Sequence, residues 1–195
     1  SNEALGGTTF NYDLQLAIET SFTGKDQLTT VLRGGNFDGD GNVFGSGGPS
    51  GLAALETAFQ EGDRPNLVAI DKLFSSFPLG YEITITIGPI VGQEDMLAIW
   101  PSVYPSDPIL DVLTVNGAPG AYNKNKGAGV GISWAAESGA RASANYVAAN
   151  GASSDIRSGG FATDEAGGTV TLQLGWEGDN WGVSALYSKV QNGQD

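Results

Sequence analysis

Four acidic residues that could attract a cation lie in one long insertion, which runs from Gly88 to Lys126. The insertion is rich in proline and aromatic residues, and its charged candidates are Glu94, Asp95, Asp107, Asp111, Lys124 and Lys126. Acidic groups in a confined, water-filled space attract cations by Coulomb forces. We therefore expect the insertion to act as a constriction loop that favours cations, while packing on an outer surface or in a trimer interface stays open as the alternative.

Few residues of this chain could catalyse a reaction or bind a metal. It has no His and no Cys, which excludes Ser-His-Asp and Cys-His catalysis and thiolate metal sites. Asp38-Gly39-Asp40-Gly41-Asn42 has the acidic spacing that begins an EF-hand loop, but such a loop needs Gly at its sixth and Glu at its twelfth position. This chain has Val43 and Pro49 there. We interpret the segment as a solvated turn, and the sequence predicts no enzyme, no metal site and no cofactor.

The elements that must position these residues are β-strands, because apolar and polar residues alternate in eight stretches. The predicted strands are Phe10–Phe22, Gln27–Gly34, Leu67–Phe77, Tyr81–Ile87, Gly127–Ala135, Ala140–Ala148, Gly168–Trp176 and Trp181–Lys189. Leu52–Gln60 fits either a strand or a short helix. We place it inside a loop, because every tight turn then lies at one end of the strands and every long loop at the other.

Strand alternation alone does not separate a membrane barrel from a soluble one, which has the same period with its apolar face inward. Two features favour the membrane. The loop asymmetry is strict, as in outer-membrane barrels with short periplasmic turns. Aromatic residues also crowd the tight turns, which is typical of an interfacial girdle; they are Phe22, Phe77, Tyr81, Trp134, Trp176 and Trp181. The expected fold is therefore an all-β, antiparallel transmembrane β-barrel.

In such a barrel the polar side of each strand lines the lumen and the apolar side faces lipid. The predicted pore-lining residues are Asp13, Gln15, Glu19, Arg33, Lys72, Glu82, Arg141 and Asn145. The predicted lipid-facing residues of the first strand are Tyr12, Leu14, Leu16 and Ile18. We also expect the turns near Gly24, Gly80, Gly139 and Gly178 to lie together at one rim, with Ser1 and Asp195 at the other.

The composition of the chain limits the classes of partner that it could bind. The chain has 195 residues, 30 glycines, 16% charged residues and a net charge of −13, which argues against nucleic acid as a partner. It contains no run of 18 or more apolar residues, so the sequence predicts no transmembrane helix. Bacterial barrels usually start and end in the periplasm, whereas both ends here are expected on the outer side. We therefore interpret residues 1–195 as one partial barrel domain that lacks both ends.

Two motifs carry a resemblance to a known family. Thr20-Ser21-Phe22-Thr23-Gly24-Lys25-Asp26, followed by Leu32-Arg33-Gly34-Gly35-Asn36-Phe37, resembles the major outer-membrane porins of cyanobacteria. These proteins are relatives of the carbohydrate-selective porins and are often described as iron-uptake porins. Asp71–Gly80 is similar to the family's D-R-L-x-Y-x-F-P-L-G segment, with Lys72 for Arg and Ser75 for Tyr, and Gly127–Gly131 is similar to a small-residue strand start. The likeness covers most of the chain.

The resemblance implies a signal peptide, an N-terminal domain that binds peptidoglycan, and a trimeric barrel of roughly 16 strands, of which this chain would supply about eight. It also implies location in the outer membrane, in contact with lipid. The expected function is a porin for passive diffusion of small hydrophilic solutes and inorganic ions, with iron among the candidates. The alternative is a structural anchor that links the outer membrane to the cell wall through the missing domain.

Overall fold

The computed structural model describes residues 7–38, 41–45, 54–106, 109–114 and 121–192. The chain divides into two compact units. Unit 1 comprises Ser1–Ala17, Val31–Asp71 and Val103–Asn116, and unit 2 comprises Ile18–Thr30, Lys72–Ser102 and Gly117–Asp195. Each unit is described by itself.

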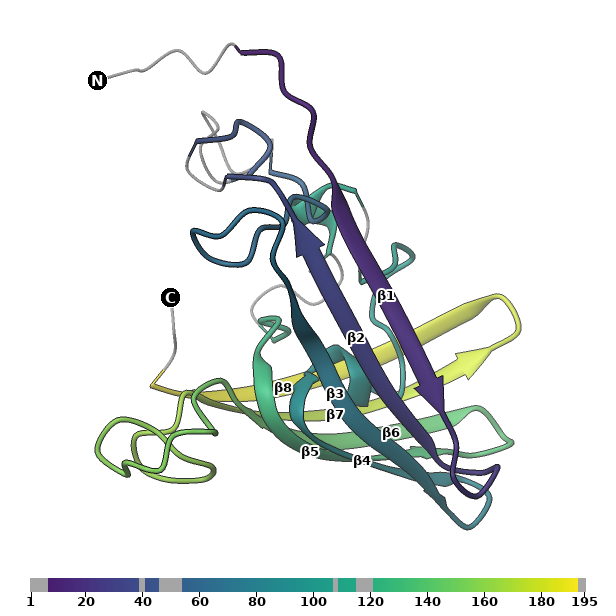
Figure 1. The fold of residues 1–195 in the computed structure, drawn as a ribbon. Helices are drawn as coiled ribbons and strands as arrows, with labels where there is room; N and C mark the ends of the chain where they lie inside the picture. Colours follow the sequence, from purple (N-terminus) through teal and green to yellow (C-terminus); the bar gives the residue numbers. More distant parts are fainter. Residues whose placement is uncertain (1–6, 39–40, 46–53, 107–108, 115–120, 193–195) are drawn as a thin grey trace. The chain divides into compact units, whose positions relative to one another are not determined.

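The structure is an antiparallel sheet of eight strands that are hydrogen bonded in sequence order (Figure 1). The strands are β1 (Asp13–Thr20), β2 (Gln27–Gly35), β3 (Val68–Leu79), β4 (Ile83–Gly92), β5 (Lys126–Ala135), β6 (Ala140–Ala148), β7 (Gly168–Gly178) and β8 (Trp181–Gln191). The described part of the insertion between β4 and β5 contains two short 3-10 helices, η2 (Glu94–Met96) and η3 (Asp111–Leu113). The prediction of an all-β, antiparallel fold with eight strands is confirmed.

Because consecutive strands are antiparallel neighbours, their connections alternate between the two ends of the sheet. The short connections follow β1, β3, β5 and β7, and the long ones follow β2, β4 and β6. Gly80 has a φ of 80° in the turn after β3, a backbone conformation that glycine adopts without steric cost. The four turns therefore share one end of the strands, as predicted, while Ser1 and Asp195 lie outside the described residues.

The two largest differences from the predicted strand boundaries are in β1 and β4. β1 begins at Asp13 rather than Phe10, and β4 continues past Ile87 to Gly92, so the long insertion starts later than expected. The pairing of β4 with β5 shifts register between Gly88 and Val91, which interrupts the alternation. Pro89, which has no N–H to donate, lies inside this irregular stretch. Because the bulge interrupts the period-two alternation, the sequence pattern did not predict the last part of the strand.

The segment Leu52–Gln60 was expected to lie in a loop. Its described part, residues 54–60, contains no strand or helix beyond an isolated bridge between Leu55 and Leu110. The placement in the loop is confirmed for these residues, which belong to unit 1. Leu52 and Ala53 lie outside the described residues.

The six strands β3–β8 present an apolar face and a polar face within unit 2. One row of paired residues crosses all six strands on the apolar face: Phe77, Ile85, Ile132, Ala144, Leu172 and Tyr187. The adjacent row on the other face is Ser76, Thr86, Gly131, Asn145, Thr171 and Ser188. Since neighbouring residues of a strand point to opposite sides, apolar and polar rows alternate across the whole sheet.

Burial is the reverse of that in a water-soluble sheet. On β7 the apolar residues Leu172 and Leu174 are 47% and 69% exposed, whereas the polar residues Thr171 and Gln173 are 0% and 1% exposed. A cluster of buried apolar residues consists of Phe74, Val91, Met96 and Val147. It includes Met96 of η2, so the insertion contributes to it. The apolar face of β3–β8 is therefore exposed, and the polar face carries the contacts to the insertion.

Candidate functional site

The first part of the insertion, Gln93–Ser102, packs on the polar face of unit 2. Gln93 is fully buried, and its side-chain oxygen accepts a hydrogen bond from the backbone N–H of Asn123 at 3.1 Å. Its side-chain amide donates to the Thr171 hydroxyl on β7, and its backbone carbonyl accepts from Asn145 Nδ2 on β6 at 3.4 Å. Gln93 thus connects the insertion to two neighbouring strands.

A second tether lies six residues further along the insertion. The Ile99 backbone N–H donates to Gln173 Oε1 at 2.9 Å, and Gln173 Nε2 donates to the Ile99 carbonyl at 2.6 Å. The side-chain amide of Gln173 therefore satisfies both backbone groups of Ile99, as a neighbouring strand would. The Ala98 N–H also donates to Ser143 Oγ on β6 at 3.2 Å. Buried backbone groups need such partners, so these side chains hold the segment against the sheet.

Glycines on the polar face of β5 and β7 permit this close approach. A Cβ atom at Gly131 would lie 2.7 Å from Met96 Sδ, and one at Gly175 would lie 2.7 Å from Ile99 Cδ1. Both distances are far below van der Waals contact. The glycines at 131 and 175 therefore have a packing reason: the absence of side chains makes room for the insertion.

Charged residues gather where the insertion leaves β4. Lys72 Nζ on β3 lies 2.7 Å from Glu94 Oε1 and 2.9 Å from Asp95 Oδ1, and all three side chains are about four-fifths buried. The Tyr122 hydroxyl donates to Glu94 Oε2 at 3.2 Å, and the Gly92 N–H donates to Asp95 Oδ2 at 2.9 Å. We call Lys72, Glu94 and Asp95 the loop charge cluster. It holds two carboxylates and one ammonium, a formal net charge of −1.

Opposing effects act on the pKa of Asp95 in this cluster. Burial raises the pKa of the Asp95 carboxyl, the Glu94 carboxylate beside it adds to this, and the Lys72 ammonium opposes both. Tyr122 is buried, and its ring packs edge to face against Trp100 with ring centroids 5.1 Å apart. The cluster is therefore linked through Tyr122 to an aromatic pair of the insertion.

Two of the predicted pore-lining residues form an ion pair in unit 1. Arg33 Nη2 lies 2.6 Å from Asp13 Oδ2, and Arg33 Nε donates to Asp13 Oδ1 at 3.0 Å, a bidentate geometry. The same guanidinium donates to the Glu56 carbonyl and lies 4.4 Å from the centre of the Phe59 ring. Asp13 and Arg33 thus act as a pair, and their charges compensate.

The remaining predicted pore-lining residues have different surroundings. Gln15 and Glu19 are exposed on β1. Arg141 on β6 lies 3.1 Å from Glu177 Oε2, and Asn145 is 4% exposed beneath Gln93. Within the described residues, Asn145 Oδ1 has no hydrogen-bond partner. Glu82 belongs to the turn before β4 rather than to the strand, and it accepts a hydrogen bond from the Trp134 indole at 3.0 Å.

The predicted constriction-loop residues are divided between the two units. Glu94 and Asp95 lie in the loop charge cluster of unit 2, whereas Asp111 lies in η3 of unit 1. Lys124 and Lys126 line a cavity of about 300 Å³ together with Asn123, Asn125 and Thr169. Asp107 lies outside the described residues.

The two glutamine tethers, Gln93 and Gln173, were not among the predicted site residues. Gln173 carries a signal in retrospect, since it is a long amide side chain next to the short Thr169 and Thr171 on the polar side of β7. Gln93 carries none, because its partners are remote in sequence: 78 residues separate it from Thr171.

The part of the chain that the structure describes contains neither a metal-binding cluster nor a helical membrane span. Its His, Cys, Asp and Glu side chains form no group of three that could hold a metal ion. Of the candidate calcium segment, Gly39 and Asp40 lie outside that part. Its helices are all too short to cross a membrane.

Comparison with known proteins yields a distant relative. The chain is 28% identical over 185 residues to the uncharacterized protein sll0772 of Synechocystis sp.. The match covers 93% of this chain and 32% of the relative, so the chain spans about a third of the length of that protein. No protein-family model and no solved structure matches the chain.

Proposed function

We propose that this chain is part of an outer-membrane porin, a β-barrel whose aqueous channel admits small hydrophilic solutes and inorganic ions by passive diffusion. The observation that carries the proposal is the reversed burial of β3–β8. Residues such as Leu174 and Tyr187 are more than half exposed, whereas Gln173 and Asn145 are almost fully buried. Soluble proteins rarely expose contiguous apolar patches of more than a few hundred Å². A lipid environment gives such a face its favourable surroundings.

The packing of the insertion supports the same proposal. Gln93–Ser102 lies on the polar face, which in a membrane barrel is the side of the lumen. A segment tethered there by Gln93 and Gln173 would narrow the channel and carry the loop charge cluster into it. In this proposal solutes are selected by the width of the passage and by the charge of its wall, with no chemical step.

The resemblance to cyanobacterial major outer-membrane porins supports a larger assembly. In this proposal β1–β8 are about half of a barrel of roughly 16 strands that trimerises in the outer membrane. The relative in Synechocystis is about three times as long as the matched segment, which leaves ample chain for the remaining strands. The edges of the sheet at β1 and β8 would then pair with further strands, since unpaired backbone groups are very unfavourable in hydrocarbon.

Reconstitution of the complete polypeptide tests the proposal. The purified protein, added to planar bilayers, is expected to produce discrete conductance steps that scale with salt concentration. Proteoliposomes should swell in solutions of small sugars, and more slowly as the sugar becomes larger. The heat-denatured preparation is the control. Folded, membrane-inserted protein that neither conducts nor permits swelling would contradict the porin proposal and favour the structural anchor.

A further inference from the structure

The long connection Ala149–Gly167 folds back onto the apolar face of the sheet. Its Phe161 ring packs edge to face on Tyr146 of β6, with ring centroids 5.1 Å apart. The Ala162 N–H donates to the Tyr146 hydroxyl at 3.2 Å. Tyr146 pairs with Val130 on one side and Val170 on the other, so it belongs to the apolar face. The connection therefore reaches that face through two aromatic rings.

The backbone around this contact is adapted to it. Ala162 has a φ of 57°, in the left-handed region that residues other than glycine rarely occupy. Gly168, the first residue of β7, has no side chain, and a Cβ atom there would lie 2.7 Å from the Tyr146 hydroxyl and 2.8 Å from its ring. The Tyr146 ring thus lies across Gly168. A strained residue and a missing side chain both serve the docking of this loop, which points to a specific function for it.

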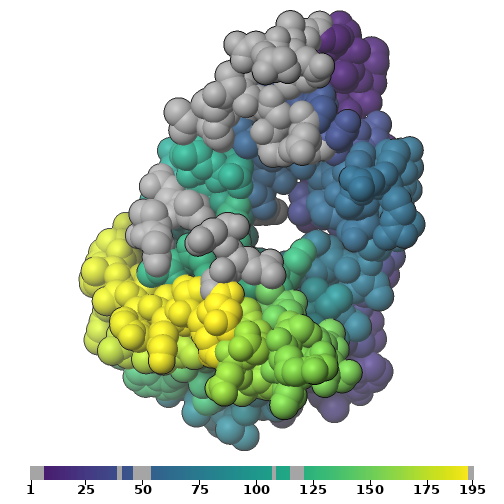
Figure 2. All heavy atoms as spheres, turned by 90° about the vertical axis from the view of Figure 1, so that its left-hand side faces the viewer, coloured from purple at the N-terminus to yellow at the C-terminus, as the bar shows by residue number. Residues whose placement is uncertain are grey.

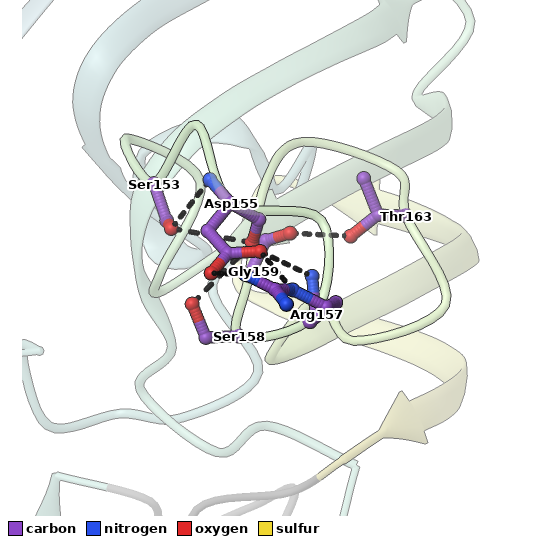
Figure 3. A network of polar contacts seen from close by, with 6 residues as sticks. All are labelled: Ser153, Asp155, Arg157, Ser158, Gly159 and Thr163. Atoms are coloured by element: carbon purple, nitrogen blue, oxygen red, sulfur yellow. Dashed lines mark hydrogen bonds and ion pairs between the residues drawn. The ribbon is translucent and has the colours of Figure 1, made fainter.

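The rest of the connection is stabilised from within. Asn150 is its centre: its side chain donates to the carbonyls of Ser158 and Glu165 and accepts from the Gly167 N–H at 2.7 Å. A second network joins Asp155 to Arg157 and Thr163 to Gly159, as Figure 3 shows. The loop therefore holds one conformation through its own hydrogen bonds.

The end of β8 holds the connection from the other side. Gln191 Nε2 donates to the carbonyls of Thr163 and Asp164, and Asn192 Nδ2 donates to the carbonyls of Asp164 and Ala166. In Figure 2 the yellow atoms of the end of β8 lie against the green atoms of the connection. The position of Phe161 beside Tyr146 is thus fixed relative to the sheet.

The apolar face gives the depth of this contact, if the proposed function holds. Along β6, Tyr146 is six residues from Ala140, which pairs with Trp176 at the end of the tight turns. At about 3.4 Å per residue this is roughly 20 Å along the strand, or about 15 Å of depth at the tilt of about 40° of outer-membrane strands. The Tyr146 hydroxyl lies over Gly168, which pairs with Ala148 two residues further along β6. It therefore lies about 20 Å from the level of Trp176, in an apolar band of about 25 Å. Lys189 lies in the same row as Tyr146 and Val170. An aromatic hydroxyl and a lysine at one level are typical of the boundary between lipid headgroups and acyl chains.

We propose that Phe161 and Tyr146 seat the connection Ala149–Gly167 at the outer headgroup–acyl boundary of the membrane, so that lipid is the partner of this loop. The inference rests on the proposed function and adds to it: a long loop anchors the barrel at the opposite boundary from the tight-turn aromatics. Continuity with the exposed apolar face favours lipid over a second protein copy as the occupant.

Depth-dependent fluorescence quenching tests this proposal. The 195 residues contain no cysteine, so single cysteines can be labelled with an environment-sensitive dye in the complete polypeptide, freed of any other cysteine. Labels at Phe161→Cys and Leu172→Cys would be compared in vesicles whose lipids carry a spin quencher near the headgroup or deep in the acyl chain. A third label, at Lys25→Cys in an exposed turn, is the aqueous control.

The expected result is that the shallow quencher is at least twofold more effective than the deep one at position 161, that the order is reversed at position 172, and that neither acts at position 25. Because Phe161→Cys removes the ring itself, Ala162→Cys keeps Phe161 and must give the same shallow depth. Quenching at 172 without quenching at 161 and 162 would overturn the loop inference and leave the porin proposal intact. Absence of quenching at all positions would overturn the membrane proposal itself. If protection of the label at position 161 from the quenchers depended on protein concentration, the partner of the loop would be a second copy of the chain instead of lipid.

Discussion

Replacement of Leu172 by arginine distinguishes a lipid-facing sheet from one that faces water. Leu172 lies near the middle of β7, paired with Ala144 and Tyr187 in the apolar row, and is 47% exposed. In a water-soluble protein, a substitution at such an exposed site usually changes stability by less than about 0.5 kcal/mol. On the lipid face of a barrel, arginine near the bilayer midplane costs about 2–4 kcal/mol. The two environments therefore predict effects that differ several-fold.

The expected loss converts into a measurable change in the folding equilibrium. A cost of about 3 kcal/mol corresponds to a reduction of roughly 100-fold in the ratio of folded to unfolded protein, since each 1.4 kcal/mol is tenfold. The assay is urea-dependent folding of the complete polypeptide into phosphatidylcholine vesicles, followed by tryptophan fluorescence and by resistance to protease. Leu172→Arg should shift the midpoint to lower urea without a change of slope.

The matched control is Asn180→Arg, in the exposed turn between β7 and β8, which changes the charge by the same amount. It should lie within about 0.5 kcal/mol of the parent protein. Leu172→Ala reports the loss of the side chain without an added charge. If Leu172→Arg and Asn180→Arg have the same small effect, the apolar face of β3–β8 does not contact lipid, and the reasoning from reversed burial is refuted.

Three further outcomes are expected. Gln173→Ala leaves the buried N–H and C=O of Ile99 without partners, at a cost of about 1–3 kcal/mol for each group, so amide hydrogen exchange at Ile99 should accelerate and single-channel conductance should rise. Lys72→Met removes the cation from the loop charge cluster, so reversal potentials should shift toward stronger cation selectivity. Hydrogen bonds from Thr23 lower the pKa of the Asp26 carboxyl below its ordinary 3.8. The carboxylate therefore stabilises its turn above pH 3.8, and this stability is lost as the pH falls through the lowered pKa. Asp26→Asn should remove this pH dependence, which amide exchange in the turn would measure.

Each of these predictions has a control in the same chain. Gln15→Ala alters an exposed glutamine of β1 and should leave exchange at Ile99 unchanged, and Lys25→Met removes an exposed turn lysine and should barely move the reversal potential. Asp179→Asn is the corresponding control in another tight turn. Unaltered exchange in Gln173→Ala would mean that the tether is dispensable. A shift toward anions in Lys72→Met, or acid sensitivity that persists in Asp26→Asn, would contradict the electrostatic reasoning.

The strands could be predicted because period-two alternation is a local property of the sequence. Tyr81–Ile87 alternates cleanly and forms most of β4, but the prediction stopped before the bulge between Gly88 and Val91. A bulge replaces the alternation with an extra residue, so no local pattern extends the strand through it. The prediction of Leu52–Gln60 succeeded for a different reason: it used the direction of all the strands rather than the local sequence.

The contacts of the insertion could not be predicted in the same way. Gln173 and Ile99 are 74 residues apart, and their pairing depends on how the insertion folds onto β5–β7. Gly131 of β5 was visible in the sequence, but only the position of Met96 explains it. The pairing of charges could not be predicted for the same reason. Asp13 and Arg33 were assigned separately to the pore wall, and their bidentate geometry joins them into one neutral pair.

Charge pairing changes how the selectivity of the proposed channel should be calculated. The sequence alone counts Glu94 and Asp95 as two negative charges, but Lys72 lies within 3 Å of both, so the cluster carries −1. In Lys72→Met the cluster should therefore carry a charge of −2. In the double variant Glu94→Gln, Asp95→Asn it should carry +1, from the remaining lysine. Cation selectivity is expected to decrease in the order Lys72→Met, parent protein, double variant.

Salt and pH should act on this order in defined ways. The differences should shrink as salt rises, because screening acts over about 8 Å at physiological ionic strength. Since the pKa of Asp95 is raised, acidification should neutralise this carboxyl before an ordinary aspartate and move the parent protein toward the double variant at a pH above 3.8. An unchanged reversal potential across all three proteins would mean that permeating ions do not pass the loop charge cluster, and the constriction would have to lie elsewhere in the channel.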